Sequence, residues 1–117
     1  MAWDMGEVGH AMEFQDLIQR AMEVRKRYAE LEQATCGQVW TSEQVALGFV
    51  GDVGDLAKLV LARSGVRRIP DAEGKLAHEL ADCLWSVMVL SQMYEVDLEH
   101  VFLQTMDDLE QHIESQL

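Results

Sequence analysis

The segment from Leu76 to Tyr94, LAHELADCLWSVMVLSQMY, is an apolar run that contains two acids, Glu79 and Asp82, three residues apart. An α-helix turns about 100° per residue, so it would place both acids on the same face as Cys83 and Leu90. An isolated buried carboxylate costs several kcal/mol, and it either stays protonated or acquires a positive partner. The segment therefore predicts a largely buried helix with something positive beside its two acids.

A second segment, ALGFVGDVGDLAKLVLA, repeats the arrangement with Asp52 and Asp55 on the side of Val45 and Leu59. One such pair is usually a solvated helix face, but two pairs within apolar helices favour a shared site. Converging carboxylates raise one another's pKa, and Mg²⁺ accepts carboxylate ligands in octahedral geometry. We predict a Mg²⁺ site, with Mn²⁺ as an alternative ion, whose ligands are Asp52, Asp55, Glu79 and Asp82.

Other metal sites fit the sequence less well. Zinc prefers closely spaced His and Cys, and a di-iron bundle needs two Glu-x-x-His units. The one such unit, Glu7 to His10, lies in a weakly periodic N-terminus.

The composition predicts an all-α protein. One proline and few aromatic residues accompany many Ala, Leu, Glu, Gln and Met residues in a chain of 117 residues, long enough for one domain. Steps of three and four residues between apolar positions predict a four-helix bundle with helices at about 11–33, 42–63, 70–94 and 98–114. The apolar surfaces of these helices are too broad for so small a domain to cover. We therefore expect dimerisation to complete the bundle, as a homodimer or a dimer of dimers.

Local signals mark the helix ends. Thr41 is followed three residues later by Gln44, as in a capping box. Gly65 has the character of a C-terminal stop, and we expect Pro70 and Asp71 in the first turn of the next helix. The glycines at positions 48, 51 and 54 predict either close helix packing or the approach of a flat ligand.

The net charge of −12, from 21 acids and nine bases, disfavours binding to nucleic-acid polymers and anionic membranes. The longest strongly apolar stretch, CLWSVMVL, is too short to cross a bilayer. The N-terminus has no signal-peptide pattern, and the distant Cys36 and Cys83 are expected to be reduced thiols, so we predict a cytoplasmic protein. Four of the nine bases gather in LARSGVRRIPDAEGK, which suits either an anion such as a polyphosphate or a solvated loop.

The stretches GDVGDLAK, HELADCLW and YEVDLEHVF resemble the EELGELAE, EELGDVLW and GIDLEEA stretches of the MazG-like, all-α nucleoside triphosphate pyrophosphohydrolases. The resemblance covers about Thr41 to Leu117. It implies Mg²⁺-dependent cleavage of a (d)NTP between its α- and β-phosphates, giving a monophosphate and pyrophosphate, in the removal of non-standard or excess nucleotides. Asp52 and Asp55 stand at the second and third glutamates of the first family motif, and Gly51 replaces the first.

The resemblance also implies roles for individual residues. Asp52, or otherwise Glu79, would accept the proton of the attacking water. Trp40 and Trp85 are candidates for selecting the base. Residues expected to contact the nucleotide are Lys58, Arg63, Arg67, Arg68, Lys75 and Trp85.

Two other functions remain open at this stage. The changes at Gly51, Asp52 and Asp55 would suit a nucleotide- or metal-binding regulator that has lost efficient hydrolysis. A structural helical dimer is the second alternative, with its acids protonated or paired with Arg63.

Overall fold

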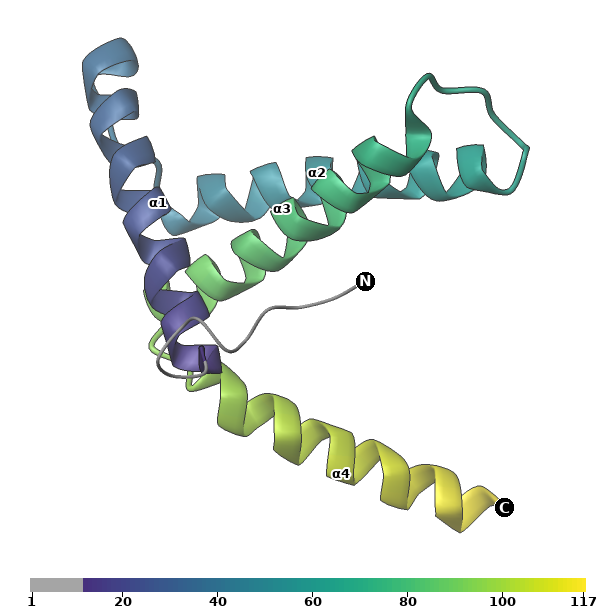
Figure 1. The fold of residues 1–117 in the computed structure, drawn as a ribbon. Coiled ribbons are helices and arrows are strands. Elements are labelled where there is room, and N and C mark those ends of the chain that lie inside the picture. Colours follow the sequence, from purple (N-terminus) through teal and green to yellow (C-terminus); the bar gives the residue numbers. More distant parts are fainter. Residues whose placement is uncertain (1–11) are drawn as a thin grey trace.

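The computed structural model describes residues 12–117, which form four helices and no strand. The helices are α1 (Phe14–Cys36), α2 (Ser42–Arg63), α3 (Ala72–Met93) and α4 (Leu98–Gln116). Figure 1 shows α2 and α3 side by side, α1 across one end of this pair, and α4 projecting away from the other three. The prediction of an all-α protein with four helices is confirmed.

Both ends of α2 follow the predicted signals. The backbone N–H of Thr41 donates to Gln44 Oε1 at 2.8 Å, and the N–H of Gln44 donates to Thr41 Oγ1 at 3.3 Å, which completes the capping box. At the other end Gly65 has a φ of 87°, in the left-handed region that favours glycine. The N–H of Val66 then donates to the Leu61 carbonyl at 3.0 Å and closes the helix.

The predicted start of α3 was wrong by two residues. The helix begins at Ala72, so Pro70 precedes it and Asp71 is its N-cap residue, with a φ of 52°. Aspartate tolerates this left-handed conformation better than most residues, and it lets the chain turn sharply into the helix. The acid in the first turn is Glu73 instead.

The bounds of α1 are also shifted from the expected 11–33, and Ala11 lies outside the described residues. The helix begins after Glu13, whose N–H donates to Asp16 Oδ2 at 2.9 Å in a capping box. It continues to Cys36 because the first residue that favours a left-handed stop is Gly37, at a φ of 73°.

A small core joins α1 to α3. Ile18 and Ala21 of α1 are buried against Met88 of α3. Trp85 packs beside them, and its indole N–H donates to the Ala21 carbonyl at 3.0 Å. The Trp85 ring also lies 5.6 Å, centre to centre, from the ring of Tyr28, so this tryptophan anchors α3 to α1.

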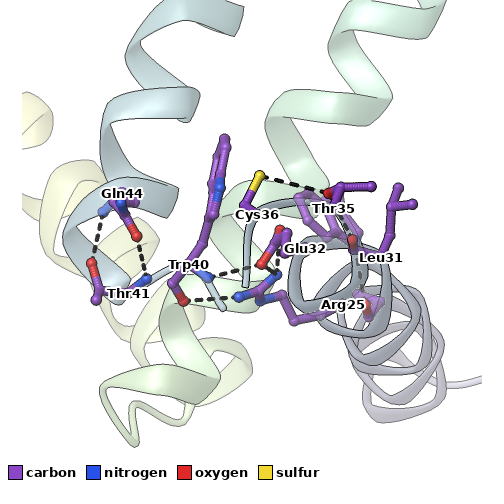
Figure 2. A network of polar contacts seen from close by, with 10 residues as sticks. Arg25, Leu31, Glu32, Thr35, Cys36, Trp40, Thr41 and Gln44 are labelled. Atoms are coloured by element: carbon purple, nitrogen blue, oxygen red, sulfur yellow. Dashed lines mark hydrogen bonds and ion pairs between the residues drawn. The ribbon is translucent and has the colours of Figure 1, made fainter. Parts of the chain in front are cut away.

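A buried arginine fixes the connection between α1 and α2 (Figure 2). Arg25, only 7% exposed, donates through Nη1 to both carboxylate oxygens of Glu32, at 3.0 and 3.1 Å. Its Nη2 donates to the Trp40 carbonyl at 2.9 Å, and the Trp40 N–H donates to Glu32 Oε1 at 2.8 Å. The Trp40 ring lies over Gly48, where an added Cβ would be 3.3 Å from it. The connection is therefore held by its backbone as well as by the indole ring.

In a single chain, α4 leaves the bundle open. None of its residues is buried, and every residue from Val101 onward is exposed. The radius of gyration is 17.7 Å, whereas a compact domain of this length has a radius of about 13 Å. Completion of the bundle by a second chain stays a prediction. None of the helices in residues 12–117 is long and apolar enough to cross a membrane.

We predict that Arg25→Ala lowers the free energy of unfolding by roughly 3 kcal/mol, because it leaves the Glu32 carboxylate nearly buried without its cation. Urea unfolding measures the effect. Arg27→Ala is the matched control: it breaks an exposed ion pair with Glu30 on the same helix and should cost less than about 1 kcal/mol. Equal losses in the two variants would show that Arg25 does not fix the connection.

Candidate metal centre

The candidate site lies where α2 faces α3. On α2, Val45 and Leu59 are buried toward the two ends of the helix, and Asp52 lies between them on the same side. On α3, Glu79 precedes the buried residues Ser86, Met88 and Val89. Packing of the apolar positions thus brings the acids of one helix toward those of the other.

The structure brings three of the four predicted ligands together. Asp52, Asp55 and Glu79 each offer a carboxylate oxygen, and these oxygens lie within 4.8 Å of one another. We call these three residues the acidic trio. The fourth, Asp82, lies beside the trio without joining it: its Oδ2 is 3.1 Å from Nε2 of His78, one turn earlier on α3.

Glu79 has one carboxylate oxygen that neither water nor a protein donor reaches. Its Oε2 is buried and has no hydrogen-bond partner. Burial raises the pKa of Glu79, and the neighbouring charges of Asp52, Asp82 and Asp55 raise it further, against a smaller opposing effect of His78. The ionised side chain therefore lacks a positive partner at close range.

Two neighbours of Glu79 share this environment. The pKa of Asp52 is raised by burial and then by the charges of Asp82 and Asp55. The pKa of the Cys83 thiol is raised by burial and then by Asp52 and Glu79, which keeps it protonated and a poor nucleophile.

These groups suit a divalent cation that prefers oxygen. Three carboxylates within reach of one another, one of them with an unpartnered oxygen, supply hard ligands and negative charge. A cation among them would relieve both the desolvation of Glu79 and the mutual repulsion of the acids. Asp52, Asp55 and Glu79 would hold it, with Asp82 alongside.

A cleft of about 500 Å³ extends from the trio toward the connection between α2 and α3. Asp55 and Glu79 line one part of it, and Lys58, Lys75 and His78 also contribute to its wall. Carboxylates and cationic side chains thus share one solvent-open cleft. This combination can hold a metal ion and a phosphate chain next to each other.

The other predicted nucleotide contacts lie elsewhere. Arg67 and Arg68 line a second hollow, of about 420 Å³, in the same connection, and Arg63 is hydrogen-bonded to Glu73. Trp85 belongs to the core with α1, whereas Trp40 is 43% exposed above Gly48. Glu7 and His10 lie outside the described residues.

Sequence reasoning missed two polar arrangements. The pair of His78 and Asp82 had a signal in its spacing of four residues, which places both side chains on one helix face. No pattern in the sequence indicated that Arg25 and Glu32 would contact Trp40. The arginine binds the backbone carbonyl of Trp40, which lies in a connection without regular structure.

Comparison with known families agrees with the acid pattern. The family model described as "MazG nucleotide pyrophosphohydrolase domain" matches residues 41–114. The chain belongs to this family. Searches of curated proteins and of solved structures gave no further match. The matched MazG residues include both acid pairs and the whole cleft between α2 and α3.

We predict that Glu79→Gln stabilises the metal-free protein at pH 7 and that this gain disappears as the pH falls below 4.5. The reason is that the folded-state pKa of Glu79 lies above its ordinary value of 4.5, so the wild type loses stability as the pH rises through the folded-state value. Unfolding in urea with EDTA, from pH 4 to 7, measures the difference between the two proteins.

The control for this experiment is Glu30→Gln, at an exposed ion pair of α1. It should change stability by less than about 1 kcal/mol throughout. A constant difference between Glu79→Gln and wild type across this pH range would contradict the prediction.

Proposed function

We propose that the chain is a Mg²⁺-dependent nucleotide pyrophosphohydrolase that cleaves the α–β phosphate bond of a (d)NTP and serves in the cytoplasm to remove non-standard or excess nucleotides. The observation that carries this proposal is the acidic trio with its unpartnered Glu79 oxygen, at a cleft that lysines also line. Membership of the MazG family supports the reaction class.

The cleft suggests how the phosphate chain would lie. Lys58 and Lys75 line it together with Asp55 and Glu79, so they can balance the charge of phosphates bound next to a metal ion. Farther along the connection, Arg67 and Arg68 line a separate hollow where they would contact an anion, and Arg63 would do so if it gave up its hydrogen bond to Glu73.

The reaction needs a water molecule, a base and a stabilised leaving group. A divalent cation, when bound, neutralises phosphate charge and lowers the pKa of water. Asp52 accepts the proton of the attacking water through a carboxylate oxygen that the cation does not engage. The water oxygen bonds to phosphorus, the bond to the bridging oxygen breaks, and pyrophosphate leaves. Glu79 is the second choice of base.

The base of the nucleotide would meet an aromatic side chain. Gly48 and Asp52 lie one turn apart on α2, so the Trp40 ring above Gly48 stands about one turn from the acids. The cluster of Arg25 and Glu32 holds the Trp40 backbone in place. Trp85 would affect the binding of the base only indirectly, by supporting α3 from the core, because its indole N–H is hydrogen-bonded to α1.

A panel of (d)NTPs incubated with Mg²⁺ or Mn²⁺ tests the proposal. We expect release of a monophosphate and pyrophosphate from at least one nucleotide, and a fall in kcat of about 100-fold or more in Asp52→Asn and in Asp82→Asn. Glu30→Gln, an acid far from the site in sequence and exposed, should retain full activity. If no nucleotide is turned over while Mg²⁺ still raises the Tm of wild type and not of Glu79→Ala, the protein is a binding regulator instead.

We further propose a homodimer, or a dimer of dimers, from the amount of surface left exposed. The chain of 13.3 kDa exposes 9202 Å², whereas a compact monomer of this mass exposes about 6,500 Å². The excess is larger than the roughly 800 Å² that each partner contributes to a standard interface. Exposed apolar residues on α4, among them Phe102, Leu109 and Ile113, supply a surface that a second chain would cover.

Light scattering after size exclusion tests this assembly. We expect at least twice the chain mass of 13.3 kDa for wild type, and a smaller mass for the double variant Phe102→Glu and Leu109→Glu, which places charge on the apolar face of α4. Asp107→Asn, a polar change on the same helix, is the control. A wild-type mass equal to one chain at micromolar concentration would contradict the proposal.

A further inference from the structure

Asp82 lies between two groups that compete for it. Its Oδ2 is 3.1 Å from His78 Nε2 and the contact joins adjacent turns of α3, with the side chains 40% and 73% exposed respectively. The negative charge of Asp82 also raises the pKa of Asp52 and of Glu79, so Asp82 lies close to the trio. Even so, Asp82 does not belong to the group of carboxylates whose oxygens all lie within 4.8 Å of one another, which consists of the trio.

We propose that His78 is a positioning residue that competes with a divalent cation for Asp82. In the metal-free protein His78 holds Asp82 beside the acidic trio, and Asp82 leaves His78 to become the fourth ligand when a cation binds. This inference rests on the proposed metal centre and deepens it.

The energies on the two sides make such an exchange feasible. A solvent-exposed pair of this kind, four residues apart on a helix, contributes less than about 1 kcal/mol. When Asp82 coordinates a divalent cation next to the three acids of the trio, the cation neutralises the negative charges of all four carboxylates. This contributes more free energy than the contact between Asp82 and His78. The contact with His78 is therefore strong enough to orient Asp82 and weak enough to be given up.

The competitor is a feature of this chain. In HELADCLW the histidine occupies the position where the family stretch EELGDVLW has its first glutamate. A glutamate four residues before Asp82 would repel it, whereas histidine attracts it. His78 also lines the cleft that runs from the trio, so its side chain is free to move into solvent once Asp82 has turned away.

Metal binding without nucleotide tests the proposal on the full chain. Calorimetric titration with Mn²⁺ should show binding about twofold to threefold tighter in His78→Ala than in wild type, since a weak competitor has been removed. The gain should vanish when Asp82→Asn is also present. His78→Gln, whose amide can still donate to Asp82, should remain close to wild type.

A second measurement follows the imidazole itself. On addition of Mg²⁺, the NMR signals of the His78 ring should shift in wild type and stay unchanged in Asp82→Asn. His100 and His112, both on α4, are internal controls whose signals should not move. Because the His78 side chain is 73% exposed, the variants should keep the wild-type helical circular dichroism.

Three results would overturn the inference. The first is an equal gain in affinity with and without Asp82→Asn, which would mean that only a charge had been removed. The second is a His78 ring that does not respond to Mg²⁺, and the third is no metal binding at all. Metal binding without the coupling would leave the metal centre standing, whereas coupling without nucleotide turnover would refute the proposed hydrolase and support the exchange at Asp82.

Discussion

The unpartnered carboxylate of Glu79 is the feature on which the candidate site depends. Its Oε2 is buried between α2 and α3 with no hydrogen bond, and the charges of three neighbouring acids raise its pKa further. A chain with a net charge of −12 has little to gain from such an arrangement unless a cation joins it. The unpartnered Glu79 oxygen is thus the best argument for metal binding, because a cation beside it would offset both its burial and the charges of its neighbours.

The packing that keeps the acids together is modest, and it is supported from outside the site. Only Val45 and Leu59 of α2 are buried, while Trp85 attaches α1 to α3 and the cluster of Arg25 and Glu32 attaches α1 to the connection before α2. Without α1, the repelling faces of α2 and α3 would be held by few buried residues. The buried arginine therefore serves the site indirectly, by fixing the connection from which α2 begins.

Sequence reasoning reached the helices and the acids because both depend on local rules. The capping box at Thr41 and the spacing of the acid pairs are read within one or two turns. The left-handed Asp71 and the contact of Arg25 with the Trp40 carbonyl depend on how distant segments meet, so no pattern along the chain announced them. The separation of α4 from the other helices could not be read from the sequence either. An amphipathic stripe shows that one face of a helix will be covered, but it does not show whether the same chain or a second chain covers it.

The acids of the motif also differ in how the structure places them. Glu79 and Asp82 match the family stretch directly, while Asp52 and Asp55 are one methylene shorter than the family glutamates. Yet both shortened side chains reach Glu79, and it is Asp82 that pairs with a neighbour on its own helix. Motif identity records which residue is present, whereas ligation depends on which other groups compete for its oxygens. In this chain the residue that we propose as the competitor, His78, lies just outside the matching acids.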